Sequence, residues 1–218
     1  MPWSARLRRH PSAFLLAAQL LSLLLFPVID NTGNGRLLYA AVATVVVALA
    51  LWVVNRSPAV NWVAWLFAAP AISLSLLAAL LGRTELQVWA SVCECGLYFY
   101  SVGALIAYML QDHEVTADEL FAAGATFTLL AWGFAYAYFV CQAWYPGSFT
   151  AMQAPDSPRS WIELLFLSFT TLSGVGLGDV LPLSAPARVL VMLEEFAGVG
   201  YIAAIVSRLI GLTVRERS

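Results

Sequence analysis

Thr170–Asp179 reads T-T-L-S-G-V-G-L-G-D, and this stretch decides how the rest of the chain is interpreted. Gly174, Gly176 and Gly178 alternate within it. Glycine adopts backbone conformations that other residues resist, so alternating glycines let carbonyl groups turn toward one line. Long apolar segments flank the stretch and place it at membrane depth, where non-helical backbone survives only inside protein or beside a watery cavity. Because a ring of carbonyls can replace the hydration shell of a cation, the stretch predicts an ion-selectivity filter.

The surrounding sequence resembles the pore of tetrameric potassium channels, whose filter reads T-V-G-Y-G-D. Phe169–Asp179 carries the filter resemblance, and S-W-I-E-L-L-F at 160–166 is similar to the start of a pore helix. The run S-A-P-A-R at 184–188 and the following apolar segment with Gly198 resemble the entry into a pore-lining inner helix. The resemblance covers roughly residues 121–211 and implies a bacterial six-span channel that assembles as a homotetramer.

The resemblance also implies roles for individual residues. The ion-coordinating filter would comprise Gly174, Val175, Gly176, Leu177 and Gly178, with potassium held by the carbonyls of the first four. Support for the filter would come from Thr171 and Ser173 behind or below it, Asp179 at its outer mouth, and Glu163 and Glu194. Gly198 matches a hinge position, although close helix packing would also require a small residue there. Permeating potassium ions are expected, and no cofactor is.

Two residues depart from the family pattern. Gly174 stands where the family has a threonine, so the innermost ion site would lose a ring of hydroxyl ligands. Leu177 stands where the family has an aromatic residue, and leucine cannot form a hydrogen bond to the helix behind the filter. These departures keep two alternatives open, a weakly selective cation channel and a non-conducting channel-like membrane protein.

The composition is that of an integral membrane protein. Of the 218 residues, 61% are hydrophobic and 11% are charged, whereas soluble domains carry about 25% charged residues. The net charge of -2 implies no nucleic-acid partner. No stretch is long and polar enough for a separate soluble ligand-binding domain.

Six apolar segments are each long enough for a transmembrane helix, which needs roughly 17–25 residues. They are Ala13–Ile29, Leu37–Val54, Val60–Leu81, Val88–Leu110, Leu120–Trp144 and Ala185–Leu212. The expected fold is therefore an all-α integral membrane protein with six transmembrane helices. A re-entrant pore helix and the filter would lie between the fifth and sixth. Residues 1–117 would form a four-helix N-terminal region, and residues 118–218 the pore domain.

A short helix is expected immediately before the filter. Ser160 precedes its first turn, and Glu163 three residues later completes a capping box. The helix would have ~12 residues, too few to cross a bilayer, and the negative end of its dipole would point at a cation in the pore.

Arginines near the span ends set the orientation. Seven would lie in the cytoplasm: Arg6, Arg8, Arg9, Arg56, Arg208, Arg215 and Arg217. Four would lie outside: Arg36, Arg83, Arg159 and Arg188. This bias predicts a multi-pass protein of the plasma membrane with both termini in the cytoplasm and the filter on the outer side. The bacterial assignment rests on analogy with compact channels.

The charged residues within the spans indicate further roles. The fourth span contains no arginine, so it is not an arginine voltage sensor. The charged residue of this span, Glu94, is either a functional intramembrane carboxylate or a hydrogen-bonded structural residue. In the sixth span, Glu194 would brace the filter or form a carboxylate ring that concentrates cations, and the role of Glu195 stays open.

One enzyme class shares part of the motif. Gly176-Leu177-Gly178-Asp179 fits G-x-G-D, the signature of intramembrane aspartyl proteases. That chemistry needs two aspartates, and no span supplies the second. The remaining aspartates are Asp30, Asp112, Asp118 and Asp156. The sequence therefore predicts a channel rather than an enzyme.

Overall fold

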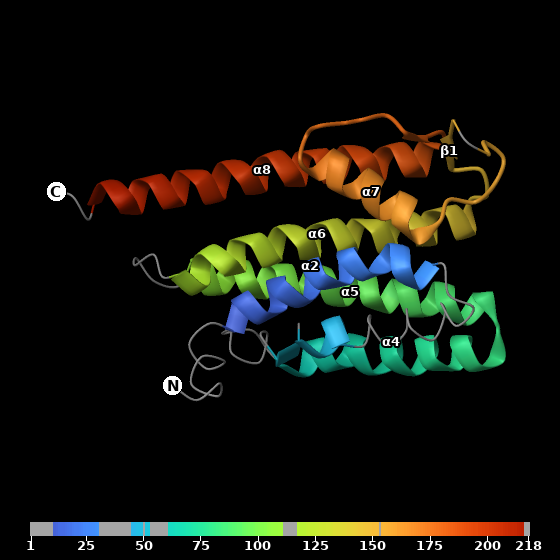
Figure 1. Ribbon diagram of the computed structural model, residues 1–218, viewed down its shortest axis with the longest axis horizontal. Coiled ribbons are helices and arrows are strands. Elements are labelled where there is room, and N and C mark those ends of the chain that lie inside the picture. Colours follow the sequence, from blue (N-terminus) through green and yellow to red (C-terminus); the bar gives the residue numbers. More distant parts are fainter. Residues whose placement is uncertain are drawn as a thin grey trace.

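The computed structural model describes residues 11–30, 45–49, 51–52, 61–110, 117–152 and 154–215. Its helices are α2 (Pro11–Asp30), α4 (Asn61–Leu81), α5 (Thr84–Met109), α6 (Ala117–Trp144), α7 (Trp161–Leu172) and α8 (Ala185–Arg215). Two short strands, β1 (Phe149–Ala151) and β2 (Val180–Pro182), pair antiparallel. The helices run roughly side by side along the long axis of the molecule (Figure 1).

Helix α6 lies at the centre of the bundle. It packs against α5 and α2 on one side and against α7 and α8 on the other, while α4 covers the far side of α5. Its sequence is apolar all round, the pattern of a helix buried in a core. Leu129, Ala135 and Tyr138 along α6 are fully buried. The helix therefore joins the N-terminal helices to the α7–α8 unit, which carries the loop Ser173–Asp179.

The reversal between α4 and α5 has a local cause. Gly82 follows the last residue of α4 with φ 64°, the left-handed conformation that ends many helices. Arg83 is extended, and α5 begins at Thr84. The fourth expected span, Val88–Leu110, thus begins four residues earlier than the apolar pattern indicated, because Thr84 and Glu85 belong to the helix rather than to the turn.

Four described helices are long and apolar enough to cross a membrane by length and composition: Trp62–Leu81, Thr84–Met109, Asp118–Trp144 and Ala185–Arg208. These correspond to the third to sixth expected spans. The first expected span coincides with α2. The second, Leu37–Val54, lies largely outside the described residues, although residues 45–49 and 51–52 are helical. A mostly helical, membrane-embedded protein agrees with these lengths, and the count of six spans stays a prediction.

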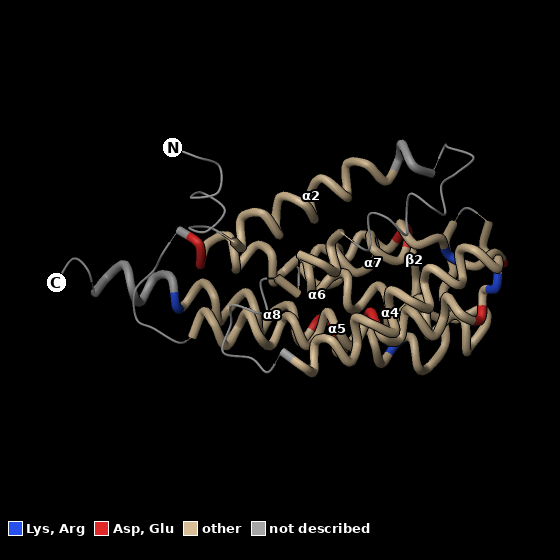
Figure 2. The backbone as a smooth tube through the Cα atoms, turned by 90° about the horizontal axis from the view of Figure 1, so that it is seen from below, with Lys and Arg blue, Asp and Glu red and all other residues tan. Residues whose placement is uncertain are grey.

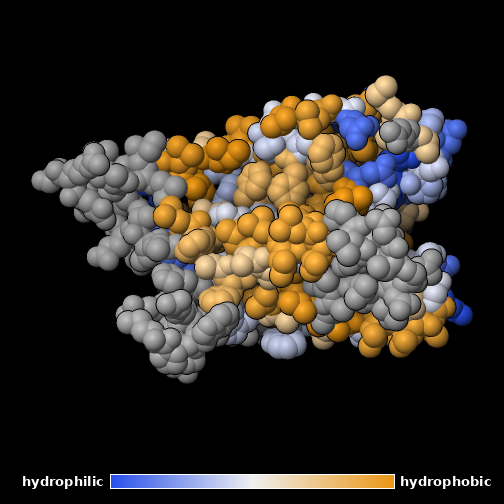
Figure 3. Space-filling view, in the orientation of Figure 1, coloured by the Kyte–Doolittle hydropathy of each residue, from blue (hydrophilic) through white to orange (hydrophobic). Residues whose placement is uncertain are grey.

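The surface has the polarity of a membrane protein. Apolar side chains cover the middle of the face shown in Figure 3, and polar side chains gather at the end that carries β1. Charged residues lie mainly near the two ends of the bundle, and few lie along the helices between them (Figure 2). Exposed tryptophans such as Trp62, Trp89 and Trp144 lie near helix ends, where aromatic residues meet the membrane–water interface.

Candidate functional site: the loop after α7

Helix α7 begins with the predicted capping box. The amide N–H of Glu163 donates to the Ser160 hydroxyl (3.4 Å), and the amide N–H of Ser160 donates to Glu163 Oε2 (2.7 Å). The helix is 12 residues long, as expected. Burial opposes ionisation of Glu163, but the hydrogen bonds from Ser160 and the charge of Arg159 outweigh it and hold the pKa of this carboxyl below its ordinary value. Glu163 thus stabilises the start of α7, at the other end of the helix from the loop Ser173–Asp179.

A clamp that the sequence did not reveal holds the segment before α7. The amide N–H of Arg159 donates to Gln142 Oε1, and Gln142 Nε2 donates to the Arg159 carbonyl, both at 2.9 Å. The buried guanidinium of Arg159 donates to Ser157 O (3.1 Å) and to Glu163 Oε1 (3.1 Å). Paired bonds between an amide side chain and a distant backbone give no periodic signal, so sequence patterns could not find them.

The C-terminal end of α7 fixes the start of the glycine-containing loop that follows it. The Thr170 carbonyl accepts from the N–H groups of Val175 (2.9 Å) and Gly176 (3.0 Å), and the Thr171 carbonyl accepts from Gly174 N–H (3.0 Å). Helix C-terminal carbonyls have no partners within their own helix. Here the loop itself supplies the donors, so the position of Gly174–Gly176 depends on the position of the last turn of α7.

Three glycines of the loop have positive φ. The angles are 74° at Gly174, 57° at Gly176 and 68° at Gly178. An L-residue in this left-handed region costs roughly 1–2 kcal/mol, which explains why glycine occupies these positions. Val175 and Leu177 alternate with them and are exposed. The glycines thus take the left-handed backbone that their residue type permits, and coordination of an ion by this loop stays a prediction.

The other expected support residues lie around this loop. Thr171 is buried in the last turn of α7. Ser173 caps the helix and donates through its hydroxyl to the Phe169 carbonyl (2.7 Å). Asp179 is exposed where the loop enters β2. All residues from 173 to 179 are exposed in the single chain.

The exit of the loop is held by the β1–β2 pair, which the all-helical expectation missed. Phe149 pairs with Pro182 and Ala151 with Val180. Leu183 N–H extends the pairing by donating to the Ser148 carbonyl (2.8 Å). The segment after α6 is thereby attached directly to the residues that follow the loop Ser173–Asp179.

Glu194 lies behind α7 and not on an open surface. Its side chain is 0% exposed. One carboxyl oxygen contacts the Ser168 hydroxyl on α7, and the other contacts the Tyr138 hydroxyl on α6. This burial argues against a carboxylate ring that faces an open path, and support of the filter by Glu194 stays a prediction. The neighbouring Glu195 is exposed, and its role stays a prediction.

Gly198 makes the closest approach between α8 and α7. A Cβ atom at this position would lie 2.1 Å from the Leu172 carbonyl oxygen. Close packing therefore explains the glycine without a hinge, and α8 continues as a helix through it. Hinge bending at Gly198 stays a prediction.

Glu94 has a structural environment among the N-terminal helices. It is buried on α5, and the Ser75 hydroxyl of α4 donates to Glu94 Oε1 (3.2 Å). Tyr98, one turn further along α5, stacks on Tyr136 of α6 with ring centroids 5.5 Å apart. The hydrogen bond from Ser75 is one that the structural interpretation of Glu94 requires, and the choice between the two interpretations stays open.

At the other end of the bundle, ionic and hydrogen bonds join α6 to three helices. Arg208 of α8 pairs with Glu119 of α6 at 3.2 Å. Asp118 accepts from the Ser12 hydroxyl of α2 (3.0 Å) and from the Tyr108 hydroxyl of α5 (3.3 Å). The first turn of α6 therefore connects α8 to the N-terminal helices.

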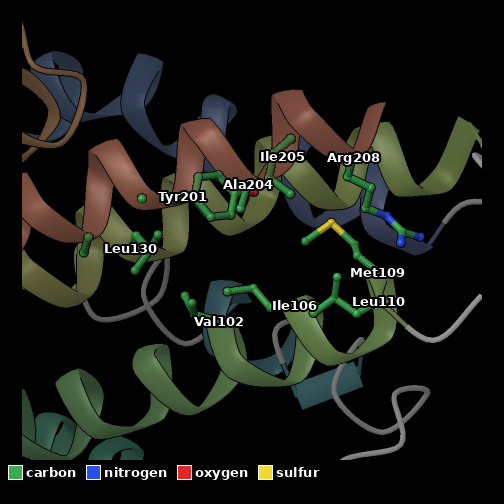
Figure 4. A pocket seen from close by; sticks show the side chains of 11 residues that line it. Val102, Ile106, Met109, Leu110, Leu130, Tyr201, Ala204, Ile205 and Arg208 are labelled. Atoms are coloured by element: carbon green, nitrogen blue, oxygen red, sulfur yellow. The ribbon is translucent and has the colours of Figure 1, made fainter. Parts of the chain in front are cut away.

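An apolar cavity of about 320 Å³ lies between α5, α6 and α8. Arg208 lies at one end of it, beside Met109 (Figure 4). Gly200 is part of its wall. The full lining is Val102, Ile106, Met109, Leu110, Leu130, Ala197, Gly200, Tyr201, Ala204, Ile205 and Arg208.

Comparison with known proteins agrees with the geometry of the C-terminal half. No curated protein and no solved structure gave a match to the chain. A family model described as an ion channel matches residues 124–215. The matched region contains most of α6, all of α7 and α8, and the loop with the three positive-φ glycines. The match and this geometry support an ion-channel pore in residues 124–215.

Proposed function

We propose that the chain is one subunit of a homotetrameric passive cation channel that conducts potassium. The observation that carries the proposal is the loop Gly174–Gly178, with its alternating positive φ angles at the end of a helix too short to span a bilayer. The ion-channel match over the same region favours a transport protein over an enzyme.

Backbone carbonyls would form the filter. The four coordinating groups on each chain are the carbonyls of Gly174, Val175, Gly176 and Leu177, and carbonyl oxygens suit a hard, dehydrated cation. Helix α7 serves as the pore helix. Its last turn holds the filter in place through Thr170 and Thr171, whose carbonyls accept hydrogen bonds from N–H groups of the loop.

Exposure of the loop supports assembly around an axis. Residues 173–179 are open to solvent in the single chain, and irregular backbone is not tolerated against lipid. Large apolar side chains on the neighbouring face of α8 are also exposed, including Phe196 at 82% and Val199 at 64%. Further copies of the chain would cover this face and place four loops around one water-filled path.

A second candidate function differs from the first in its ion selectivity. Gly174 has no hydroxyl for an inner ligand ring, and Leu177 offers no hydrogen bond to α7. Both residues favour a less rigid filter, so a weakly selective cation channel is the alternative. The same mechanism applies to it, with a smaller preference for potassium.

Ion flux from liposomes tests the proposal. Vesicles holding the purified protein are loaded with potassium or with sodium, and the release of each ion is measured. Potassium release well above sodium release is the expected result, and equal release favours the weakly selective alternative. No release of either ion, from a protein whose native mass is that of a monomer or dimer, would contradict the proposed function.

A further inference from the structure

Three oxygen–oxygen contacts meet at Ser168 and Glu194, behind the pore helix of the proposed channel. The Ser168 hydroxyl lies 2.7 Å from the Ala131 carbonyl of α6. The same hydroxyl contacts Glu194 Oε1, and the Tyr138 hydroxyl contacts Glu194 Oε2. Each of these contacts requires one hydrogen between its two oxygens.

The hydroxyl groups supply only two of the three hydrogens. A serine and a tyrosine each carry a single O–H, and a backbone carbonyl and an ionised carboxylate carry none. If Glu194 were ionised, Ser168 would donate either to Glu194 or to Ala131, and the other contact would bring two oxygens together without a hydrogen. A proton on Glu194 Oε1 removes the conflict, because Glu194 then donates to Ser168 and Ser168 donates to Ala131.

The surroundings of Glu194 favour the same state. Glu194, Ser168 and Tyr138 are each 0% exposed. A buried carboxylate is expensive unless a cation pairs with it, and neither ion pair of the described residues includes Glu194. Those pairs are Arg159–Glu163 and Arg208–Glu119.

The titratable neighbours of Glu194 carry no positive charge. Tyr138 faces it from α6, with Cys141 close to that tyrosine, and Glu195 follows it on α8. Helix α7 contributes the neutral Ser168. A negative charge on Glu195 would oppose a second negative charge beside it.

We infer that Glu194 is a neutral carboxylic acid at neutral pH and acts as a hydrogen-bond donor in a relay from Tyr138 through Ser168 to Ala131. The functional consequence rests on the proposed channel: Glu194 positions the pore helix against both flanking helices without adding a fixed negative charge near the ion path. It is a positioning residue, since it does not touch the ion.

Infrared absorption of the full-length protein in liposomes tests the charge state directly. A protonated carboxylic acid has a carbonyl stretching band that is separate from the carboxylate bands. The expected result at neutral pH is such a band in the parent that is lost in Glu194→Gln. The amide of the variant still accepts from Tyr138 and donates to Ser168, so the fold is retained.

Two single variants assign the band. The band that is lost in Glu194→Gln should remain when Glu94, a second buried glutamate, or Glu195, the exposed neighbour of Glu194, is replaced by glutamine. An unchanged protonated-acid band in Glu194→Gln, with loss of carboxylate absorption instead, would overturn the inference.

Because this readout needs no ion flux, it stands apart from the proposed function. A protonated Glu194 in a protein that conducts no ion would leave the inference intact and contradict the channel. A protein that conducts ions but has an ionised Glu194 would support the channel and overturn the inference on Glu194.

Discussion

Gly198→Ala should damage the structure around the filter, although alanine usually stabilises a helix. The added Cβ would lie 2.1 Å from Leu172 O, 2.8 Å from its carbonyl carbon and 3.0 Å from its Cα. Ordinary van der Waals contact begins at 3.4 Å, so the Leu172 carbonyl would have to retreat by about 1.3 Å. All three atoms are backbone, and no side-chain rotation relieves the collision.

The expected cost follows from two opposing effects. Overpacking lowers folding stability by about 1–3 kcal/mol, and replacing a helical glycine by alanine raises it by roughly 1 kcal/mol. The difference is a net loss of stability of about 0–2 kcal/mol per subunit, and we expect the upper half of this range because rigid backbone yields less than side chains do. Leu172 follows directly on Thr170 and Thr171, whose carbonyls hold the loop, so potassium flux should fall with stability.

Gly200→Ala is the matched control. It lies on the same helix, a Cβ there meets no atom within 4 Å, and Gly200 borders the apolar cavity. This variant should keep or slightly raise stability through helix propensity. The assay is the thermal unfolding midpoint of both purified variants, with liposome flux measured in parallel. Equal midpoints and fluxes for the two variants would refute the packing argument.

Three further predictions concern other contacts. Gly176→Ala should lose potassium flux, because alanine at φ 57° is strained. Gly147→Ala carries similar strain at φ 78° outside the filter and should retain flux; retention by both variants would contradict the filter assignment. The pKa of Glu163 is lower in the folded state than its ordinary value of 4.5. The stabilisation from its hydrogen bonds is therefore complete above pH 4.5 and is lost as the pH falls through the folded-state pKa, because the unfolded state binds more protons in this pH range. The parent's unfolding midpoint should therefore fall more steeply below pH 4.5 than that of Glu163→Gln, and parallel curves would count against this. For Arg208 and Glu119, glutamine variants made singly and together should show a coupling of about 0.5–3 kcal/mol in unfolding, whereas additive losses would mean that the pair contributes nothing.

Features encoded by neighbouring residues could be predicted from the sequence. The capping box needs only Ser160 and Glu163, three residues apart, and the structure confirms it. The glycines of the loop indicated a special backbone because glycine alone accepts positive φ without strain. In both cases the physical cause lies within one short stretch of chain.

Features that depend on distant partners could not be predicted. The β1–β2 pair joins two three-residue segments about 30 positions apart, too short to show alternation. The polar partners of Glu194 come from two other helices. The sequence alone does not distinguish a hinge from close packing at Gly198, because its contact, Leu172, lies in another helix. The sequence singled out Glu194 and Gly198, whereas the partners that each residue contacts depend on the fold.

The reversal potential of single channels in planar bilayers tests the central claim most directly, with potassium on one side and sodium on the other. If the carbonyls of Gly174–Leu177 form a potassium filter, the current should reverse at a voltage strongly displaced in the direction set by the potassium gradient. The Gly176→Ala protein should carry no such current. A reversal at zero voltage, with equal currents of the two ions, would contradict selective conduction through this loop.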